Sequence, residues 1–255
     1  MIRLEGVSKH FAAPDGSSTI AVDDVSLQIA PGETLCLIGT SGCGKTTTLR
    51  LINRLEEPDA GRVLIGGREA SAVDPIRLRR GIGYVIQSGG LFPHLTVGAN
   101  VGLLCELEGW SRDRRRRRVV ELLDLVELPP ADFAARLPAE LSGGQRQRVG
   151  LARALALDPP ILLMDEPFGA LDPITRRQIR DEFRQFERSL QKTVVIVTHD
   201  LAEAFALGDR VALMDRGRIV QVGGETELLG QPANDFVRDF VAEHAVAARN
   251  GGTSP

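Results

Sequence analysis

The sequence predicts an α/β fold with a largely parallel sheet, and two observations indicate it. Apolar runs of four to six residues recur along the chain, and segments with a helical pattern lie between them. Runs this short, separated by ~20–30 residues, suit strands that are buried on both faces of a sheet. Strands that alternate with helices in this way are typical of α/β proteins.

The N-terminal segment departs from that alternation. Residues 2–29 contain two strand-like stretches, IRLEGV and AVDDVSLQI, joined by the turn-rich AAPDGSS, and they predict an antiparallel pair. The turn signal PGE (31–33) precedes a short strand, TLCLIG (34–39), and a helix is expected from Lys45 to Leu55. Further strands are expected at GYVIQ (83–87), ILLMDE (161–166), VVIVTH (194–199) and RVALMD (210–215).

Residues 89–141 differ from the rest of the chain. They begin GGLFPHLTVGANV and continue with two helix-like segments, one of them dense in arginine at 112–118. This indicates a helical subdomain inserted into a domain that is otherwise formed by residues 1–88 and 142–240. The last residues, 241–255, are expected to form a short disordered tail.

Composition restricts the classes of protein that remain. The 255 residues carry 31 basic and 34 acidic side chains, a net charge of −3, and this slightly acidic balance argues against nucleic-acid binding. No run approaches the ~18 apolar residues of a membrane span, and the N-terminus lacks the apolar stretch of a signal peptide. The cysteines at 36, 43 and 105 form no CxxC pair. We therefore expect a globular chain in a reduced compartment.

The arginine run at 112–118 has two interpretations. Basic runs can bind nucleic acid or anionic lipid. However, only three of the 31 basic residues are lysines, so arginine is this chain's general choice of cation. We expect a solvated helix face.

The segment between the strand at 34–39 and the helix at 45–55 fits the phosphate-loop pattern GxxxxGK[ST]. Glycines let successive backbone N–H groups point at phosphate oxygens, and the helix N-terminus adds partial positive charge. Lys45 would reach the β- and γ-phosphates, and the Thr46 hydroxyl would bind Mg²⁺. The sequence therefore predicts a nucleotide site. Its expected contacts are Gly39, Thr40, Ser41, Gly42, Cys43, Gly44, Lys45, Thr46 and Thr47.

Two adjacent carboxylates follow the apolar run ILLM at 161–164. Alone, such a run is more often a strand that reaches solvent. Beside a phosphate loop, it predicts acids at the carboxyl end of a buried strand, where ligands bind in α/β sheets. Asp165 would then hold Mg²⁺ through water, and Glu166 would polarise the attacking water.

A second candidate anion-binding helix start is LSGGQ (141–145), which RQRVGLARAL follows. Ser142 and two glycines suit a helix N-terminus that could bind an anion. The alternative, of equal weight on physical grounds alone, is an ordinary helix cap after a proline-containing loop.

With these three motifs, the chain resembles the ATP-binding subunit of ATP-binding-cassette (ABC) transporters. LSGGQ is that family's signature, and the other motifs follow in the family's order along about residues 2–240. The resemblance implies a P-loop NTPase (RecA-like) core with an antiparallel β subdomain and a helical insertion. It implies ATP and Mg²⁺ as cofactors and ATP hydrolysis coupled to transport as the activity.

The same resemblance implies that two chains pack head to tail around ATP. Ser142 and Gly144 of one chain would contact the γ-phosphate held by Lys45 of the other. Their neighbours Gly143 and Gln145 belong to the same expected nucleotide contacts.

Four further positions match the family's pattern. Phe11 would stack on adenine, and Gln87 would link Mg²⁺ and the attacking water to the helical insertion. His199 of VTHD would contact the γ-phosphate. Asp172 of GALD would communicate between the two sites.

Three segments resemble ATPases of importers for glycine betaine, carnitine and choline most closely. They are residues 43–67, 79–101 and 232–241. Importers for amino acids share much of these segments, so a polar amino acid stays an alternative solute. Many osmoprotectant ATPases continue into paired C-terminal regulatory domains, and a sequence that ends at residue 255 departs from that pattern. The resemblance therefore does not extend to osmotic gating by that route.

The family also implies the partners. They are a second ATPase subunit, integral membrane permease subunits that the helical insertion would contact, and a substrate-binding protein. The expected location is the cytoplasmic face of the inner membrane, reached through the permease. A soluble, non-transport ABC ATPase is the alternative from another class, but such proteins usually carry two cassettes or a long coiled coil. A GTPase is disfavoured because no NKxD motif is present.

Overall fold

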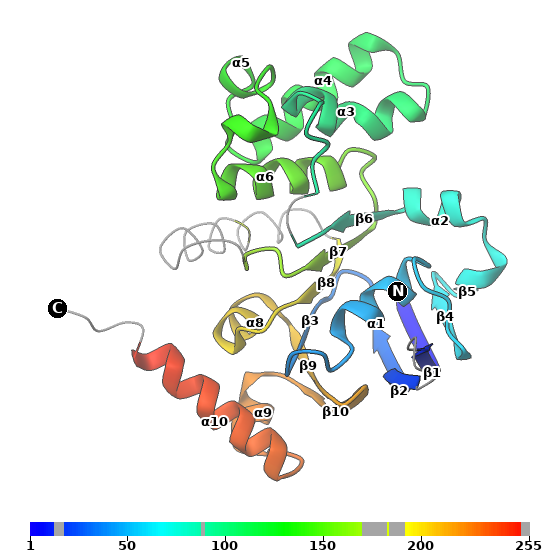
Figure 1. Ribbon diagram of the computed structural model, residues 1–255, viewed down its shortest axis with the longest axis vertical. Helices are drawn as coiled ribbons and strands as arrows, with labels where there is room; N and C mark the ends of the chain where they lie inside the picture. Colours follow the sequence, from blue (N-terminus) through cyan, green and yellow to red (C-terminus); the bar gives the residue numbers. More distant parts are fainter. Residues whose placement is uncertain (13–17, 88–89, 170–182, 184–191, 251–255) are drawn as a thin grey trace. The chain divides into compact units, whose positions relative to one another are not determined.

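The computed structural model describes residues 1–12, 18–87, 90–169, 183 and 192–250, and the side chains of these up to residue 244 (Figure 1). The chain divides into two compact units, Met1–Arg79 with Gln191–Pro255, and Arg80–Leu190. The division differs from the expected one, which placed only residues 89–141 in a separate subdomain.

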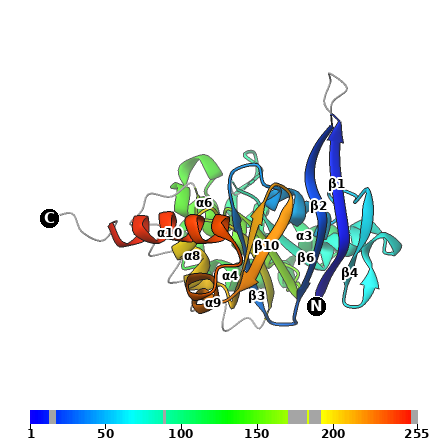
Figure 2. The same ribbon diagram turned by 90° about the horizontal axis from the view of Figure 1, so that it is seen from below.

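The first unit begins with an antiparallel sheet in the order β2-β1-β4-β5. The predicted N-terminal pair is confirmed: β1 (Ile2–Ala12) and β2 (Ser18–Ile29) run antiparallel from Ile2↔Ile29 to Ala12↔Ser18. Figure 2 shows these two strands side by side. The other edge of β1 pairs with β4 (Ala60–Ile65), which pairs in turn with the short β5 (Arg68–Glu69).

A second set of strands in this unit carries the predicted parallel pairing. β3 (Thr34–Gly39) is parallel to β8 (Thr193–Val197) on one side and to β9 (Arg210–Asp215) on the other. Every residue of β3 and β8 is buried, as strands covered on both faces require. Antiparallel β10 (Arg218–Gly223) adds to β9. The helical elements of this unit are α1 (Lys45–Ile52), η1 (Ala70–Ala72), α8 (Leu201–Leu207), α9 (Glu225–Gly230) and α10 (Asp235–Asn250), and α2 (Pro75–Arg80) leads into the second unit.

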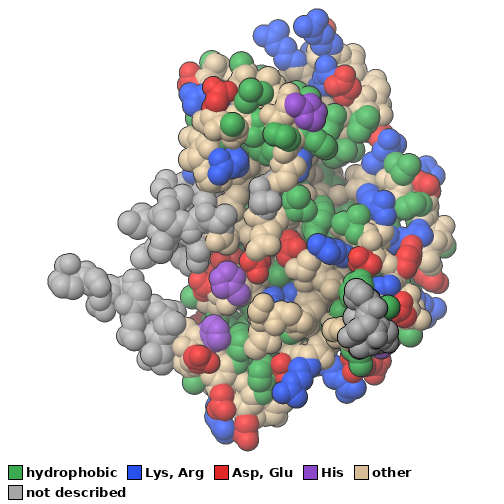
Figure 3. Space-filling view, viewed as in Figure 1, with side chains coloured by type: hydrophobic (Ala, Val, Ile, Leu, Met, Phe, Trp, Pro, Cys, Tyr) green, Lys and Arg blue, Asp and Glu red, His purple; other side chains and the backbone are tan. Residues whose placement is uncertain are grey.

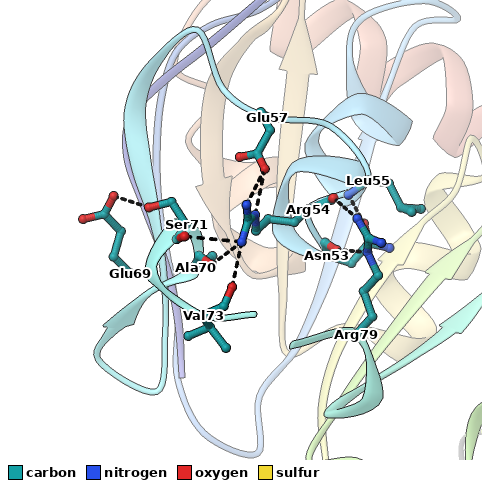
Figure 4. A network of polar contacts seen from close by, with 9 residues as sticks. All are labelled: Asn53, Arg54, Leu55, Glu57, Glu69, Ala70, Ser71, Val73 and Arg79. Atoms are coloured by element: carbon teal, nitrogen blue, oxygen red, sulfur yellow. Dashed lines mark hydrogen bonds and ion pairs between the residues drawn. The ribbon is translucent and has the colours of Figure 1, made fainter. Parts of the chain in front are cut away.

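Helix α1 ends at Ile52, three residues before the expected Leu55. Arg54 adopts a left-handed backbone with φ 54°, which cannot continue a helix. Its guanidinium donates to the carbonyl of Val73 at 2.7 Å and pairs with Glu57 (Figure 4). Arg79 donates to the carbonyls of Asn53 and Arg54 at 3.3 and 2.5 Å. The C-terminal end of α1 is thereby bound to the segment that leads into α2.

The boundary of the predicted disordered tail, residue 241, is wrong, because α10 continues past it to Asn250. Val237, Phe240 and Val241 are buried, and α10 contacts α8 and α9. His244 stacks on Phe240 with ring centroids 4.1 Å apart. This apolar face supplies the packing that stabilises a helix beyond residue 240.

The second unit combines two parallel strands with a helical cluster. β6 (Ile82–Val85) pairs with β7 (Ile161–Asp165) from Ile82↔Ile161 to Val85↔Met164. The cluster contains α3 (Val97–Leu107), α4 (Arg112–Leu125), α5 (Pro130–Phe133), η2 (Pro138–Glu140) and α6 (Gly143–Ala154).

One hydrophobic core joins α3, α4 and α6. Val101 of α3, Leu122 of α4 and Val149 of α6 are buried in the same cluster. The helix that follows LSGGQ therefore packs with the inserted helices, whereas the sequence predicted that it belongs to the core domain. The pattern of apolar residues along α6 could not tell which partner that face would have.

The arginine run lies on α4, over which basic side chains gather (Figure 3). Arg118 donates to the carbonyls of Leu155 and Ala156 at 2.8 and 3.1 Å. Arg115 pairs with Glu106. The guanidinium of the exposed Arg114 lies 3.5 Å from the centroid of the Trp110 ring, and the exposed arginines that remain are Arg112, Arg116 and Arg117. The run is thus only partly the solvated face that we expected.

No helix among the described residues has both the length and the apolar character needed to cross a membrane.

Candidate functional site

The phosphate loop of the first unit connects the end of β3 to the start of α1. Gly39 and Gly44 adopt φ values of 146° and 104°, which disfavour any residue with a side chain. A Cβ atom at Gly39 would lie 2.1 Å from the Met214 carbonyl oxygen, and one at Gly44 would lie 2.1 Å from that of Ala21. Both glycines are therefore required by the neighbouring backbone as well as by their own conformation.

Lys45 lies inside this loop and is only 7% exposed. Its Nζ donates to the carbonyl oxygens of Gly39 and Thr40, at 2.9 Å each. Thr46 and Thr47 follow in the first turn of α1 and are half-buried, whereas Ser41 and Gly42 are exposed at the tip of the loop. The ammonium group is thus held within the curve of the loop, where phosphate oxygens would need it.

Backbone contacts from the turn between β9 and β10 hold the loop in place. The Gly217 N–H donates to the Cys43 carbonyl at 3.0 Å, and the Asp23 N–H of β2 donates to the Gly217 carbonyl at 2.9 Å. Cys43 is a buried free thiol, and burial raises its pKa. The loop is therefore braced from both strand systems of its unit.

His199 lies exposed, shortly after the end of β8. The Thr198 N–H donates to the Leu37 carbonyl of β3 at 3.1 Å. Because β3 and β8 are parallel, their carboxyl ends lie at the same edge of the sheet. His199 and the phosphate loop therefore share that edge.

Phe11 lies at the far end of β1 and is 38% exposed. It pairs with Thr19 of β2, two residues from Ala21, whose carbonyl limits the space at Gly44. Two residues of strand span about 7 Å. Phe11 is therefore paired with the same strand, β2, whose backbone borders the phosphate loop at Gly44.

In the second unit, the parallel strands β6 and β7 bring two predicted residues into contact. Gln87 follows β6, and its Nε2 donates to Glu166 Oε2 at 2.8 Å. Asp165, the last residue of β7, is 6% exposed. Glu166 has a positive φ of 44°, a conformation that is costly for a residue with a side chain and that concentrates at functional sites.

LSGGQ forms the N-terminal cap of α6. Ser142 Oγ accepts from the Gln145 N–H at 3.2 Å, and Gln145 Oε1 accepts from the Ser142 N–H at 2.9 Å. These two hydrogen bonds form a capping box, so the interpretation of LSGGQ as an ordinary helix cap is correct. Gly143 and the buried Gly144 form the first turn, and Ser142 is exposed. The cap itself does not exclude anion binding, since backbone N–H groups remain at the helix start.

The structure groups the predicted residues by unit. The first unit holds Phe11, the phosphate loop and His199, and the second holds Gln87, Asp165, Glu166 and the LSGGQ cap. Asp172 lies outside the described residues. Ala21, Met214 and Gly217 also shape the phosphate loop from distant parts of the chain, and no local pattern in the sequence predicts them.

The residues expected to bind Mg²⁺ have suitable chemistry. Thr46, Gln87 and Asp165 would supply hydroxyl, amide and carboxylate oxygens, which are the kind of hard donor that Mg²⁺ prefers. The Gln87 amide oxygen is separate from the nitrogen that donates to Glu166, so both roles are compatible.

The chain is similar in sequence to proteins of known family. The ABC transporter family matches residues 22–169. The glycine betaine/carnitine/choline transport ATP-binding protein OpuCA of Bacillus subtilis is 51% identical over 243 residues, which are 95% of this chain and 63% of that protein. The osmoprotectant import ATP-binding protein OsmV of Salmonella typhimurium is 49% identical over 98% of this chain and 65% of its own length. The chain thus spans less than two thirds of either relative.

Two further proteins are matched over most of their own length. The glycine betaine uptake system ATP-binding protein YehX of Escherichia coli is 47% identical over 98% of this chain and 79% of its own length. A dimeric, post-hydrolysis structure of the ATP-binding cassette MJ0796 with ADP and Pi is 36% identical, with a TM-score of 0.79 over 88% of this chain and 98% of that one. This likeness confirms the predicted P-loop NTPase fold.

Proposed function

Because the chain belongs to the ABC transporter family, we propose that it is the ATP-hydrolysing subunit of an importer for quaternary-ammonium osmoprotectants. The observation that supports ATP binding most directly is the phosphate loop, with Lys45 held inside it and two glycines that no other residue could replace. The solute class is supported by the similarity to OpuCA, OsmV and YehX.

The phosphates and the base of the nucleotide would bind to residues of the first unit. Lys45 would exchange its two loop carbonyls for oxygens of the β- and γ-phosphates, while the backbone N–H groups of the loop bind the remaining oxygens. The exposed Phe11 ring would stack on adenine, and base–aromatic stacking contributes about 1–3 kcal/mol. Thr46, Gln87 and Asp165 would hold Mg²⁺, which neutralises phosphate charge.

Hydrolysis would use Glu166 as the group that orients and polarises the attacking water. Its carboxylate already accepts from the Gln87 amide, and this contact orients the side chain. The left-handed backbone at Glu166 further restricts where that carboxylate can point. His199, at the edge of the sheet beside the phosphate loop, would contact the γ-phosphate.

We further propose that two chains act as a head-to-tail dimer. The LSGGQ cap of one chain, through Ser142 and Gly144, would contact ATP bound to Lys45 of the other, and Asp172 would communicate between the two sites. The similarity to the ATP-binding cassette MJ0796, whose structure is dimeric, supports a dimer. Binding of ATP would then favour the closed dimer, and hydrolysis would remove the contacts that hold it.

The remaining partners follow from the same family. Integral membrane permease subunits would contact the helical cluster of the second unit, and a substrate-binding protein would deliver the solute. The chain would then lie at the cytoplasmic face of the membrane through its permease.

The test is Glu166→Gln, which keeps the shape of the side chain and removes its charge. We expect ATP affinity within about twofold of wild type and hydrolysis lowered by about 10²–10⁴, the usual contribution of a general base. The variant should also elute as a dimer in size-exclusion chromatography only when ATP is present. Glu225→Gln is the matched control, because Glu225 is an exposed glutamate at the start of α9. Near-normal hydrolysis by Glu166→Gln would remove Glu166 from this role.

The solute is tested separately, in proteoliposomes that contain the chain with its permease and substrate-binding protein. ATP-dependent uptake of labelled glycine betaine, choline or carnitine is expected. Uptake of a polar amino acid alone would contradict the proposed solute class while leaving the ATPase role intact.

A further inference from the structure

The end of β1 that carries Phe11 lacks one of the two neighbouring strands that support the rest of β1. Pairing with β4 stops at Ser8↔Ala60, whereas pairing with β2 continues through Phe11↔Thr19 to Ala12↔Ser18. Beyond Ser8, the strand pair is therefore a two-stranded ribbon, which is marginal in stability by itself. Shifts of register at Lys9 and His10 interrupt the ladder further. Contacts in addition to the pairing with β2 would therefore stabilise this end of β1.

Asp59, the residue before β4, contacts β1 just beyond the point where the pairing of β1 with β4 ends. Its N–H donates to the Ser8 carbonyl at 2.9 Å. One carboxylate oxygen, Oδ2, accepts from the His10 N–H at 2.6 Å and lies 3.3 Å from His10 Nδ1. The other, Oδ1, accepts from Lys9 Nζ at 3.1 Å. A single side chain thus binds both residues that precede Phe11.

The Lys9 contact reaches the Phe11 ring itself. Lys9 Nζ lies 5.6 Å from the centroid of that ring, within the range of a cation–π interaction, and the Lys9 side chain is only 14% exposed. The ammonium therefore contacts both the carboxylate of Asp59 and the aromatic ring. The backbone contact to His10 restricts where the strand runs, and the Lys9 contact restricts how the ring is oriented.

We propose that Asp59 is a positioning residue for nucleobase binding, which acts by orienting Phe11 through His10 and Lys9. The inference rests on the proposed role of Phe11 as the surface on which adenine stacks. The Asp59 carboxylate is anionic at neutral pH, since the His10 N–H and the Lys9 ammonium both lower its pKa.

The experiment compares ADP with pyrophosphate, both with Mg²⁺, by isothermal titration calorimetry on the full chain. ADP requires the base site and the phosphate loop, whereas pyrophosphate requires the loop alone. Loss of a hydrogen-bonded charge pair is expected to weaken ADP binding by about fivefold in Asp59→Ala and to leave pyrophosphate affinity unchanged. In a Phe11→Ala background, Asp59→Ala should have no further effect.

Two variants serve as references. Asp59→Asn keeps an acceptor for the His10 N–H and loses the charge that binds Lys9, so a smaller loss of about twofold is expected, and it keeps the test valid if Asp59→Ala folds poorly. Asp74→Ala is the matched control, because Asp74 is also an exposed aspartate that accepts from a backbone N–H, that of Arg77, at 2.9 Å. It should bind both ligands as wild type does.

Equal loss of ADP and pyrophosphate affinity in the Asp59 variants would overturn the proposal, because it would indicate a general effect on the fold. Loss of ADP affinity by Asp59→Ala in the Phe11→Ala background would overturn it as well. If Phe11→Ala weakens ADP binding and neither Asp59 variant does, the role of Phe11 stands and only the positioning role is wrong. If Phe11→Ala itself leaves ADP affinity unchanged, the proposed base site is wrong and the inference fails with it.

Discussion

The left-handed backbone of Glu166 predicts an inverted order of stability between two substitutions at that position. At ordinary helix or strand positions, glycine is less stable than alanine by about 0.5–1 kcal/mol because it loses more backbone entropy on folding. At a φ of 44°, any residue with a Cβ atom carries a strain of about 1–2 kcal/mol, which glycine does not. The difference favours Glu166→Gly over Glu166→Ala by about 0.5–1 kcal/mol. Both variants lose the carboxylate and its bond to Gln87, so those losses cancel in the comparison.

The assay is urea unfolding of the two variants, where this difference should raise the midpoint of Glu166→Gly by about 0.3 M relative to Glu166→Ala. The control uses Val120, an exposed residue inside α4, where Val120→Gly should be less stable than Val120→Ala by about 1 kcal/mol. A Glu166→Gly variant that is less stable than Glu166→Ala would refute the reasoning that this residue is strained. Under the proposed function, both Glu166 variants should fail to hydrolyse ATP.

Two other outcomes follow from glycine geometry and from charge. Gly44→Ala should lower the ADP affinity measured by calorimetry by about tenfold or more, because its Cβ would lie 2.1 Å from the Ala21 carbonyl oxygen and displace the loop. Gly67→Ala is the control and should leave ADP affinity unchanged, since Gly67 also has a positive φ but has open space around it. Equal ADP affinities in the two variants would contradict the role of the contact at Gly44. Stability should fall in acid, because hydrogen bonds from Arg62 and Arg115 lower the pKa values of Glu5 and Glu106. Carboxyl groups with lowered pKa values contribute stability above their ordinary pKa of about 4, and this contribution is lost as pH falls through the lowered values. Urea midpoints between about pH 3 and 7 should therefore decline at the acid end, less steeply for Glu5→Gln than for wild type, and parallel curves would exclude Glu5 as a contributor.

Much of the fold was predictable because the parallel strands β3, β7 and β8 are short, apolar and buried. The strands expected at 34–39 and 210–215 have the bounds that the structure gives, and the strand expected at 161–166 ends one residue earlier. The predictions that failed concern what each element packs against. Residues 241–250 form a helix because the face of α10 around Val237 and Phe240 is buried, and that burial depends on residues far away in the sequence.

In the candidate site too, local motifs were predictable from the sequence and contacts between distant residues were not. A strand, a glycine-rich turn and a lysine at the start of a helix identified the phosphate loop, since local backbone chemistry suffices to recognise it. The contact of Gln87 with Glu166 depends on β6 and β7 lying side by side, although the two residues are 79 positions apart. The left-handed backbone of Glu166 has no local signal in the sequence, because glutamate is not a residue that favours it.

The sequence by itself therefore determined the class of fold, the order of the strands along the chain and the residues with the chemistry to bind a nucleotide. These properties depend on short-range patterns of hydrophobicity and on the chemistry of individual side chains. Only the tertiary structure decided that Ala21 and Met214 leave no room for a side chain at Gly44 and Gly39, and that Asp59 binds the residues before Phe11. Such contacts join residues that are distant in sequence, and the free energy that forms them comes from the packing of the whole fold.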